Sequence, residues 1–242
     1  MTAAPVAPPG PLLAIETATS IAVVALGAPD GSLLALDAWE AGHRHAEELL
    51  ARIAALLGAA GIERPGPRTL GGVVVGTGPG GYTGLRVGLA TARGIARAAG
   101  APLVGVPTGV ALAAAARASG GAPAGMPVAI LLPAGPAGRY LVRDGLAVLA
   151  PVADDPAEAG DGRDLAPGAV LVAVDLAGRA PDDAVVRGAA AREGLAAALV
   201  ALGAARLRAG EDDGATLAPE YVTMPRGVQA VVGEVAWSPA RR

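Results

Sequence analysis

Short apolar runs bounded by turn residues fill the first forty positions of the chain. Residues 12–19, 21–27 and 33–39 have the length and composition of β-strands. Pro29, Asp30 and Gly31 form a turn signal between the second run and the third. Three strands joined by tight turns predict an antiparallel meander.

Helical spacing begins after the third strand. Residues 45–61 place Leu49, Ile53 and Leu57 on one face, and Gly61 is a stop signal. A strand and a helix then follow twice, with Thr108 expected to cap the last helix, over residues 71–76, 82–99, 102–107 and 108–118. The order βββαβαβα predicts an α/β protein with an actin-like, ribonuclease-H-like N-terminal lobe.

The second half reads as a smaller and more divergent lobe. A Gly/Pro-rich linker at 119–127 precedes a hairpin, an acidic loop at 151–167, a strand at 170–175, a long helix at 189–210 and an irregular ending from 218. We therefore predict a disordered leader at 1–11, an N-terminal lobe at 12–118 and a C-terminal lobe at 128–230.

Composition excludes several kinds of chemistry. The 242 residues include no cysteine, and all nineteen basic residues are arginine. Thiol nucleophiles, disulfides and Schiff-base lysines are therefore excluded. The first residues lack the apolar core of a signal peptide, and arginines interrupt the most apolar stretches, so we expect a soluble cytoplasmic protein.

Charge is unevenly distributed, although the net charge is only −3. No Asp or Glu lies between Arg64 and Arg143, a segment that contains eight arginines. This basic segment can face RNA phosphates or an acidic protein surface, or its arginines can simply be solvated.

The sequence VVVGTGPGGYTGLRVG, at 73–88, resembles two phosphate-binding motifs. Gly76, Gly78 and Gly81 spell G-x-G-x-x-G, and the Walker A pattern also fits except that Tyr82 replaces its lysine. Residues 98–107 contain no acid to hold a ribose, which argues against a dinucleotide site. A tight turn without a ligand, or an anion at the start of the next helix, remains open.

That next helix carries a small residue at every fourth position. Gly84, Gly88, Ala92 and Ala96 leave a smooth face on which another helix can approach closely. The face can serve the protein's own core or a partner. Arg86 and other arginines form a ridge on another side.

The segments IETATSIAVVAL, GTGPGGYTGLRVGLATARGIA and GVPT together resemble the TsaB (YeaZ) family, over about residues 12–115. This family comprises non-catalytic relatives of TsaD. The resemblance implies a two-lobed actin-like fold and a complex with TsaD and the ATPase TsaE, which transfers threonylcarbamoyl to the adenosine beside the tRNA anticodon. It also implies that a homodimer can form, that tRNA is reached through the complex, and that no cofactor is held tightly, because ATP and metal belong to the partner subunits.

The resemblance also implies which residues form sites. The pairing surface would comprise the loop and the helix after it: Gly78, Pro79, Gly80, Tyr82, Thr83, Gly84, Leu85, Arg86, Gly88, Leu89 and Ala92. A vestigial nucleotide site is expected at Glu16, Thr17, Thr19 and Thr108. Glu16 replaces the family's aspartate, and the second lobe keeps little of the family's D-A-R-x-x-E-V-Y and P-x-Y-L-R segments.

Candidates for catalysis are few. His43 and His45 lack the spacing of the metal-binding histidines in the catalytic relatives, and no serine lies in a G-x-S-x-G elbow. Glu16 and Asp175 end apolar strands and are either general acid/base groups or ordinary strand-end residues. We therefore expect a non-catalytic subunit; the alternatives are an actin-like ATP-binding hydrolase or kinase that uses Glu16 and the glycine loop, and a homodimer that has lost its partner.

Overall fold

The computed structural model describes residues 10–42, 45–66, 69–134, 138–143, 146–150, 165, 167–221, 228–231 and 234–237. The predicted leader lies outside the described residues, apart from its last two positions. His43 and nearly all of the predicted acidic loop also lie outside them.

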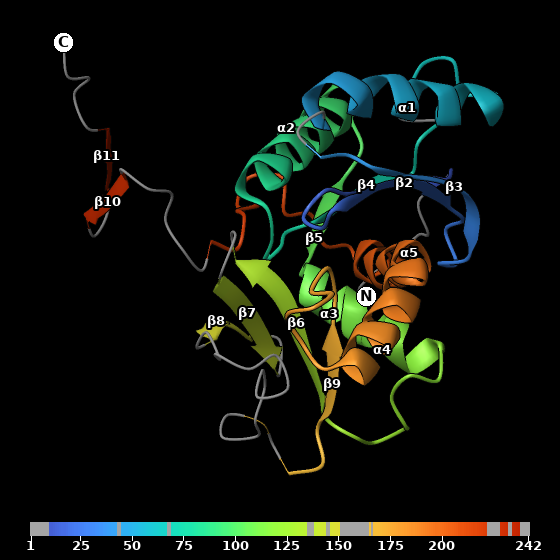
Figure 1. Cartoon of the computed structure of the whole chain (residues 1–242). Coiled ribbons are helices and arrows are strands. Elements are labelled where there is room, and N and C mark those ends of the chain that lie inside the picture. Colours follow the sequence, from blue (N-terminus) through green and yellow to red (C-terminus); the bar gives the residue numbers. More distant parts are fainter. Residues whose placement is uncertain are drawn as a thin grey trace, which may run out of the picture.

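The first sheet has the strand order β3-β2-β1-β4-β5 (Figure 1). β1 pairs antiparallel with β2, and β2 with β3, whereas β1, β4 and β5 are parallel. The predicted meander and crossovers are therefore confirmed. The strands are β1 Leu12–Glu16, β2 Ile21–Gly27, β3 Leu33–Glu40, β4 Gly72–Gly76 and β5 Leu103–Val106.

Helices α1 (His45–Ala59) and α2 (Tyr82–Ala99) cover one face of this sheet (Figure 1). The predicted apolar stripe of α1 is buried there, together with Leu85 and Leu89 of α2. Helical spacing predicted an apolar face on both helices. In the structure each helix buries that face against the sheet, and this burial stabilises the helix.

The second sheet has the order β8-β7-β6-β9, in which β6 and β9 are parallel. Its strands are β6 Val128–Ala134, β7 Gly138–Arg143, β8 Leu146–Ala150 and β9 Val170–Ala173. Helix α3 (Thr108–Ala118) packs against this sheet, and α4 (Asp182–Glu193) packs against β9. One apolar cluster contains residues of both sheets and of α3, so the two lobes share a core.

The predicted long helix is instead two helices. Gly194 ends α4 and precedes α5 (Leu195–Arg208), which returns to cover the first sheet. A Cβ on Gly27 would lie 2.1 Å from Val200 Cγ1, so the glycine permits this close approach. α5 lies within the predicted C-terminal lobe at 128–230, yet it packs on the first sheet.

Residues 211–221, which we call the C-terminal strap, run along β5. The N–H of Asp213 donates to the carbonyl of Leu103 (2.7 Å), and the N–H of Glu220 donates to the carbonyl of Thr77 (2.8 Å). Beyond the strap, β10 (Val228–Val231) and β11 (Glu234–Trp237) pair with each other, where the sequence predicted an irregular ending. Within the described residues, every helix is too short or too polar to cross a membrane.

Candidate functional site

Glu16 ends β1 and is completely buried. Its Oε1 accepts a hydrogen bond from the N–H of Ala18 (2.6 Å), and its Oε2 accepts one from the hydroxyl of Thr108 (2.8 Å). A Cβ on Gly76 would lie 1.9 Å from Oε2, so the glycine of β4 makes room for the carboxyl. The carboxyl is therefore enclosed by the protein's own groups.

Burial raises the pKa of Glu16 above its ordinary value, because desolvation disfavours the charged form. The hydrogen bonds from Ala18 and Thr108 act in the opposite direction but do not cancel this effect. A buried carboxyl with a raised pKa is typical of some catalytic acids. Here the side chain has no exposed surface from which to reach a substrate.

Thr108 does not cap α3 as predicted. Pro107 is the N-cap residue, and no side chain caps the helix. The Thr108 hydroxyl instead accepts from the N–H of Gly78 (3.0 Å) while it donates to Glu16. Thr108 therefore ties the glycine loop to the end of β1.

The structure separates the other two threonines of the predicted nucleotide site. The hydroxyl of Thr17 donates to the carbonyl of Gly84 in α2 (2.8 Å), whereas that of Thr19 donates to the carbonyl of Ile21 (2.7 Å). Of the three threonine hydroxyls, only that of Thr108 is hydrogen-bonded to Glu16, so the chain's own groups engage the side chains of this predicted site separately.

The glycine loop packs against the turn between β1 and β2. The N–H of Gly81 donates to the carbonyl of Ala18 (2.9 Å), and a Cβ on Gly80 would lie 2.2 Å from that oxygen. Gly78 and Pro79 are buried. The loop therefore uses its glycines for close packing within the chain, which is one of the two possibilities left open by the sequence.

The small face of α2 is buried within the chain. Gly84, Gly88 and Ala92 are buried beside Leu85 and Leu89. A Cβ on Gly88 would lie 2.1 Å from Thr17 Oγ1, so the face packs on the end of β1. These five residues therefore contribute to the chain's own core, so their burial argues against the prediction that they meet a partner.

The exposed part of the predicted surface lies at the start of α2. Thr83 and Arg86 are exposed, and Tyr82 is half-buried. The Arg86 guanidinium donates to the Tyr82 hydroxyl (2.9 Å), and the Tyr82 ring centroid lies 5.2 Å from that of Tyr221. We call Tyr82, Thr83, Arg86 and Tyr221 the α2 tip.

Tyr221 was missed as a site residue. The strap carries it to α2, and 40% of its surface is exposed. Its neighbour Glu220 is half-buried, and desolvation raises the pKa of that carboxyl. The family's P-x-Y segment, of which Pro219 and Tyr221 remain, was the sequence signal that could have identified it.

Asp175 follows β9 and is also engaged within the chain. Its carboxylate accepts from the N–H of Ser20 (2.7 Å) and pairs with Arg192 (2.7 Å). The carboxyl groups of Glu16 and Asp175, the two candidates for acid/base chemistry, are therefore both bonded to other groups of the chain.

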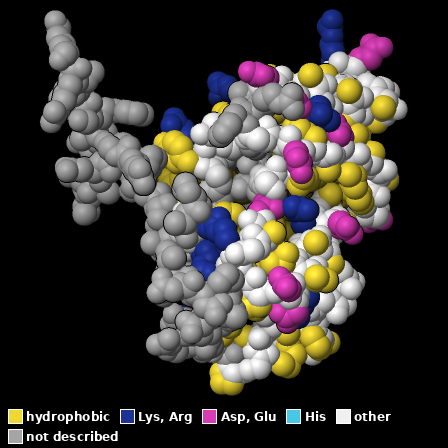
Figure 2. Space-filling model, in the orientation of Figure 1, with side chains coloured by type: hydrophobic (Ala, Val, Ile, Leu, Met, Phe, Trp, Pro, Cys, Tyr) yellow, Lys and Arg dark blue, Asp and Glu magenta, His cyan; other side chains and the backbone are white. Residues whose placement is uncertain are grey.

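Charged side chains are mixed over the visible face of the molecule. In Figure 2, arginines alternate with Asp and Glu and do not gather into one basic patch. The described part of the chain contains no group of three or more His, Cys, Asp or Glu side chains that could hold a metal ion.

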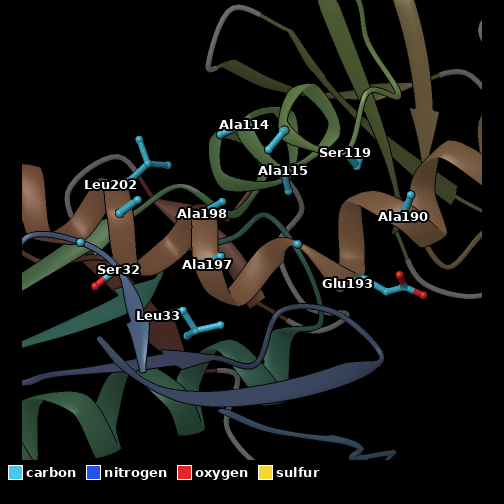
Figure 3. A pocket seen from close by; sticks show the side chains of 14 residues that line it. Ser32, Leu33, Ala114, Ala115, Ser119, Ala190, Glu193, Ala197, Ala198 and Leu202 are labelled. Carbon is cyan, nitrogen blue, oxygen red and sulfur yellow. The ribbon is translucent and has the colours of Figure 1, made fainter. Parts of the chain in front are cut away.

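A groove of about 750 Å³ lies elsewhere (Figure 3). It runs between the β2–β3 turn, α3 and the junction of α4 and α5, where Leu33, Ala115, Ala198 and Leu202 point into it. None of the predicted site residues lines this groove.

Comparison with known proteins identifies relatives. The TsaD family model, described as tRNA N6-adenosine threonylcarbamoyltransferase, matches residues 39–159, which is half of the chain. A Pseudomonas aeruginosa protein of known structure, an uncharacterized protein with similarity to peptidase YEAZ, is 23% identical with a TM-score of 0.65 over 88% of this chain and 100% of that one.

YeaZ from Pseudomonas aeruginosa is 24% identical, with a TM-score of 0.61 over 88% of this chain and 99% of that one. At these identities the likeness shows the fold, and it confirms the predicted actin-like, ribonuclease-H-like architecture. No curated protein is significantly similar to the chain.

Proposed function

Because this chain belongs to the TsaD family, as a member similar to TsaB (YeaZ), we propose that it is a non-catalytic subunit of the tRNA threonylcarbamoyl transfer system. It pairs with a TsaD-type subunit that performs the transfer, and with a TsaE-type ATPase. ATP and metal bind to those partners.

The observation that carries this proposal is the enclosure of Glu16. A catalytic acid or metal ligand must touch its substrate or ion, whereas both oxygens of Glu16 are hydrogen-bonded in the core and 0% of the residue is exposed. The same enclosure argues against the ATP-binding hydrolase or kinase, which would use this carboxyl.

The α2 tip is the surface that we assign to the TsaD-type partner. Tyrosine and arginine are enriched among residues that dominate binding energy at protein interfaces. Tyr82 and Tyr221 contact each other and Arg86 contacts Tyr82, so the free chain already holds these side chains together. A surface held in place loses less conformational entropy on binding.

The test is the affinity of the purified chain for the TsaD-type subunit of its own organism. Arg86→Glu should weaken binding about tenfold or more, because it reverses the charge at the centre of the tip. Arg117→Glu is the matched control, since Arg117 is an exposed arginine on α3, a helix that packs against the second sheet and α5 and not on the face covered by α2.

Three outcomes separate the possibilities. Loss of affinity in Arg86→Glu alone supports both the subunit role and the surface. Equal affinity of both variants and the unaltered chain would retain the role and reject the surface. If the unaltered chain does not bind while it binds ATP tightly by itself, the proposed function is wrong.

A further inference from the structure

One carboxylate lies between the two lobes and is bonded to groups of both. Asp175 belongs to the second lobe, just after β9, and only 9% of its side chain is exposed. One carboxylate oxygen accepts the N–H of Ser20, which lies in the β1–β2 turn of the first lobe. The other oxygen pairs with Arg192 of α4 at 2.7 Å.

The backbone of Asp175 is unusual. Its φ is +58°, and it is the single residue other than glycine with a positive φ in the described part of the chain. Asp tolerates this left-handed conformation better than most residues, but glycine adopts it with less strain. The conformation directs the side chain toward Ser20 and Arg192, so the carboxylate has a role that glycine could not supply.

The surroundings of this carboxylate are those of an anion site. An N–H group and a guanidinium converge on it, as they do on phosphate and carboxylate ligands. A cavity of about 390 Å³ adjoins the same three residues, Ser20, Asp175 and Arg192, and is open to solvent. Small ions can therefore reach this position from outside.

We propose that the space between the lobes is an oxyanion-binding position that the chain fills with its own Asp175. The carboxylate locks the two lobes together, and while it is in place it excludes anionic ligands, including the phosphates of a nucleotide. Removing the side chain leaves Ser20 N–H and Arg192 available to a free carboxylate. This inference is independent of the proposed partner.

The experiment is chemical rescue of Asp175→Gly by acetate, which replaces the missing methylene and carboxylate. Glycine suits the φ of +58°, so the variant loses the carboxylate without new backbone strain. We expect its melting temperature to fall by about 5 °C, because two charge-assisted hydrogen bonds are lost. Sodium acetate should restore at least half of that loss, relative to sodium chloride at the same ionic strength.

Two controls make the result specific. The unaltered protein should gain no more from acetate than from chloride. Asp175→Gly combined with Arg192→Met should not be rescued, because the cation that holds the anion is absent. Equal effects of acetate on all three proteins, or no effect on Asp175→Gly, would overturn the proposal.

A second variant covers the case in which Asp175→Gly does not fold. Asn tolerates a positive φ and keeps an acceptor for Ser20, but it loses the ion pair with Arg192. Asp175→Asn should therefore melt below the unaltered protein, and the Ser20 amide hydrogen should exchange faster because the contact without the ion pair opens more often. If its melting temperature and its Ser20 exchange are unchanged, the carboxylate does not lock the lobes.

Discussion

At the scale of single residues, Glu16 shows how one carboxyl links stability to pH. Its pKa in the folded protein is raised above the 4.5 of an unperturbed glutamate, chiefly by desolvation. The folded state therefore holds the proton more tightly than the unfolded state. The carboxyl's contribution to stability is fully present below the unfolded pKa and is lost as pH rises through the folded pKa.

Glu16→Gln removes this ionisation while it keeps the shape of the side chain. As pH rises above 4.5 toward the raised pKa, the unaltered protein should lose up to about 1.4 kcal/mol of unfolding free energy per pH unit relative to Glu16→Gln. Urea denaturation of both proteins between about pH 5 and pH 8 measures the difference. A constant difference across this range would show that Glu16 ionises equally easily in both states.

At the scale of elements, α2 gives a matched pair of glycines with opposite roles. Gly88 faces Thr17, whereas Gly94 is exposed, with no atom within 4 Å of a built Cβ. Gly94→Ala should stabilise the protein by about 0.5–1 kcal/mol, since alanine favours the helix. Gly88→Ala should destabilise it by about 1–3 kcal/mol, because the methyl group displaces the buried Thr17.

Thermal or urea unfolding of these two variants measures both effects. The same Gly→Ala substitution is made at both positions, so helix propensity cannot explain changes in stability of opposite sign. If Gly88→Ala were as stable as Gly94→Ala, the small face of α2 would not be closely packed, and our reason for removing it from the partner surface would fail.

The same helix shows how far sequence could predict the structure. Its bounds, Tyr82 and Ala99, follow from the glycine loop before it and Gly100 after it, which are local signals. The spacing of Gly84, Gly88 and Ala92 also identified a face for close approach. It could not decide between core and partner, because the residue that meets Gly88 is Thr17, more than seventy positions away.

Contacts over long sequence separations explain the remaining errors. Threonine is a residue type that often caps helices, but the hydroxyl of Thr108 is hydrogen-bonded to Glu16 and to Gly78. Gly194 is itself a stop signal, but the apolar pattern continues directly after it, and the break became evident only where α5 returns to the first sheet. The hydrogen bond from Ser20 to Asp175 likewise joins the two lobes, and no local sequence pattern indicates it.

At the scale of the whole molecule, the C-terminal strap connects the edge of the first sheet with the proposed partner surface. β5 is an edge strand, and Asp213 covers it by accepting the N–H of Gly105 at 2.8 Å. Arg206 of α5 holds the same carboxylate with two hydrogen bonds, of 2.8 and 3.0 Å. The strap ends at Tyr221, in contact with Tyr82.

Releasing the strap should therefore affect two distant sites together. Asp213→Ala should cost about 2 kcal/mol of unfolding free energy and expose the Gly105 amide to hydrogen exchange, since its acceptor is gone. It should also weaken binding to the proposed TsaD-type partner, because Tyr221 is no longer held against Tyr82. Glu211→Ala is the control: Glu211 is 46% exposed and pairs with Arg206, so its loss should change stability by less than about 1 kcal/mol. If Asp213→Ala shows faster Gly105 exchange but unchanged affinity for the partner, the strap does not contribute to the interface and serves only to cover β5.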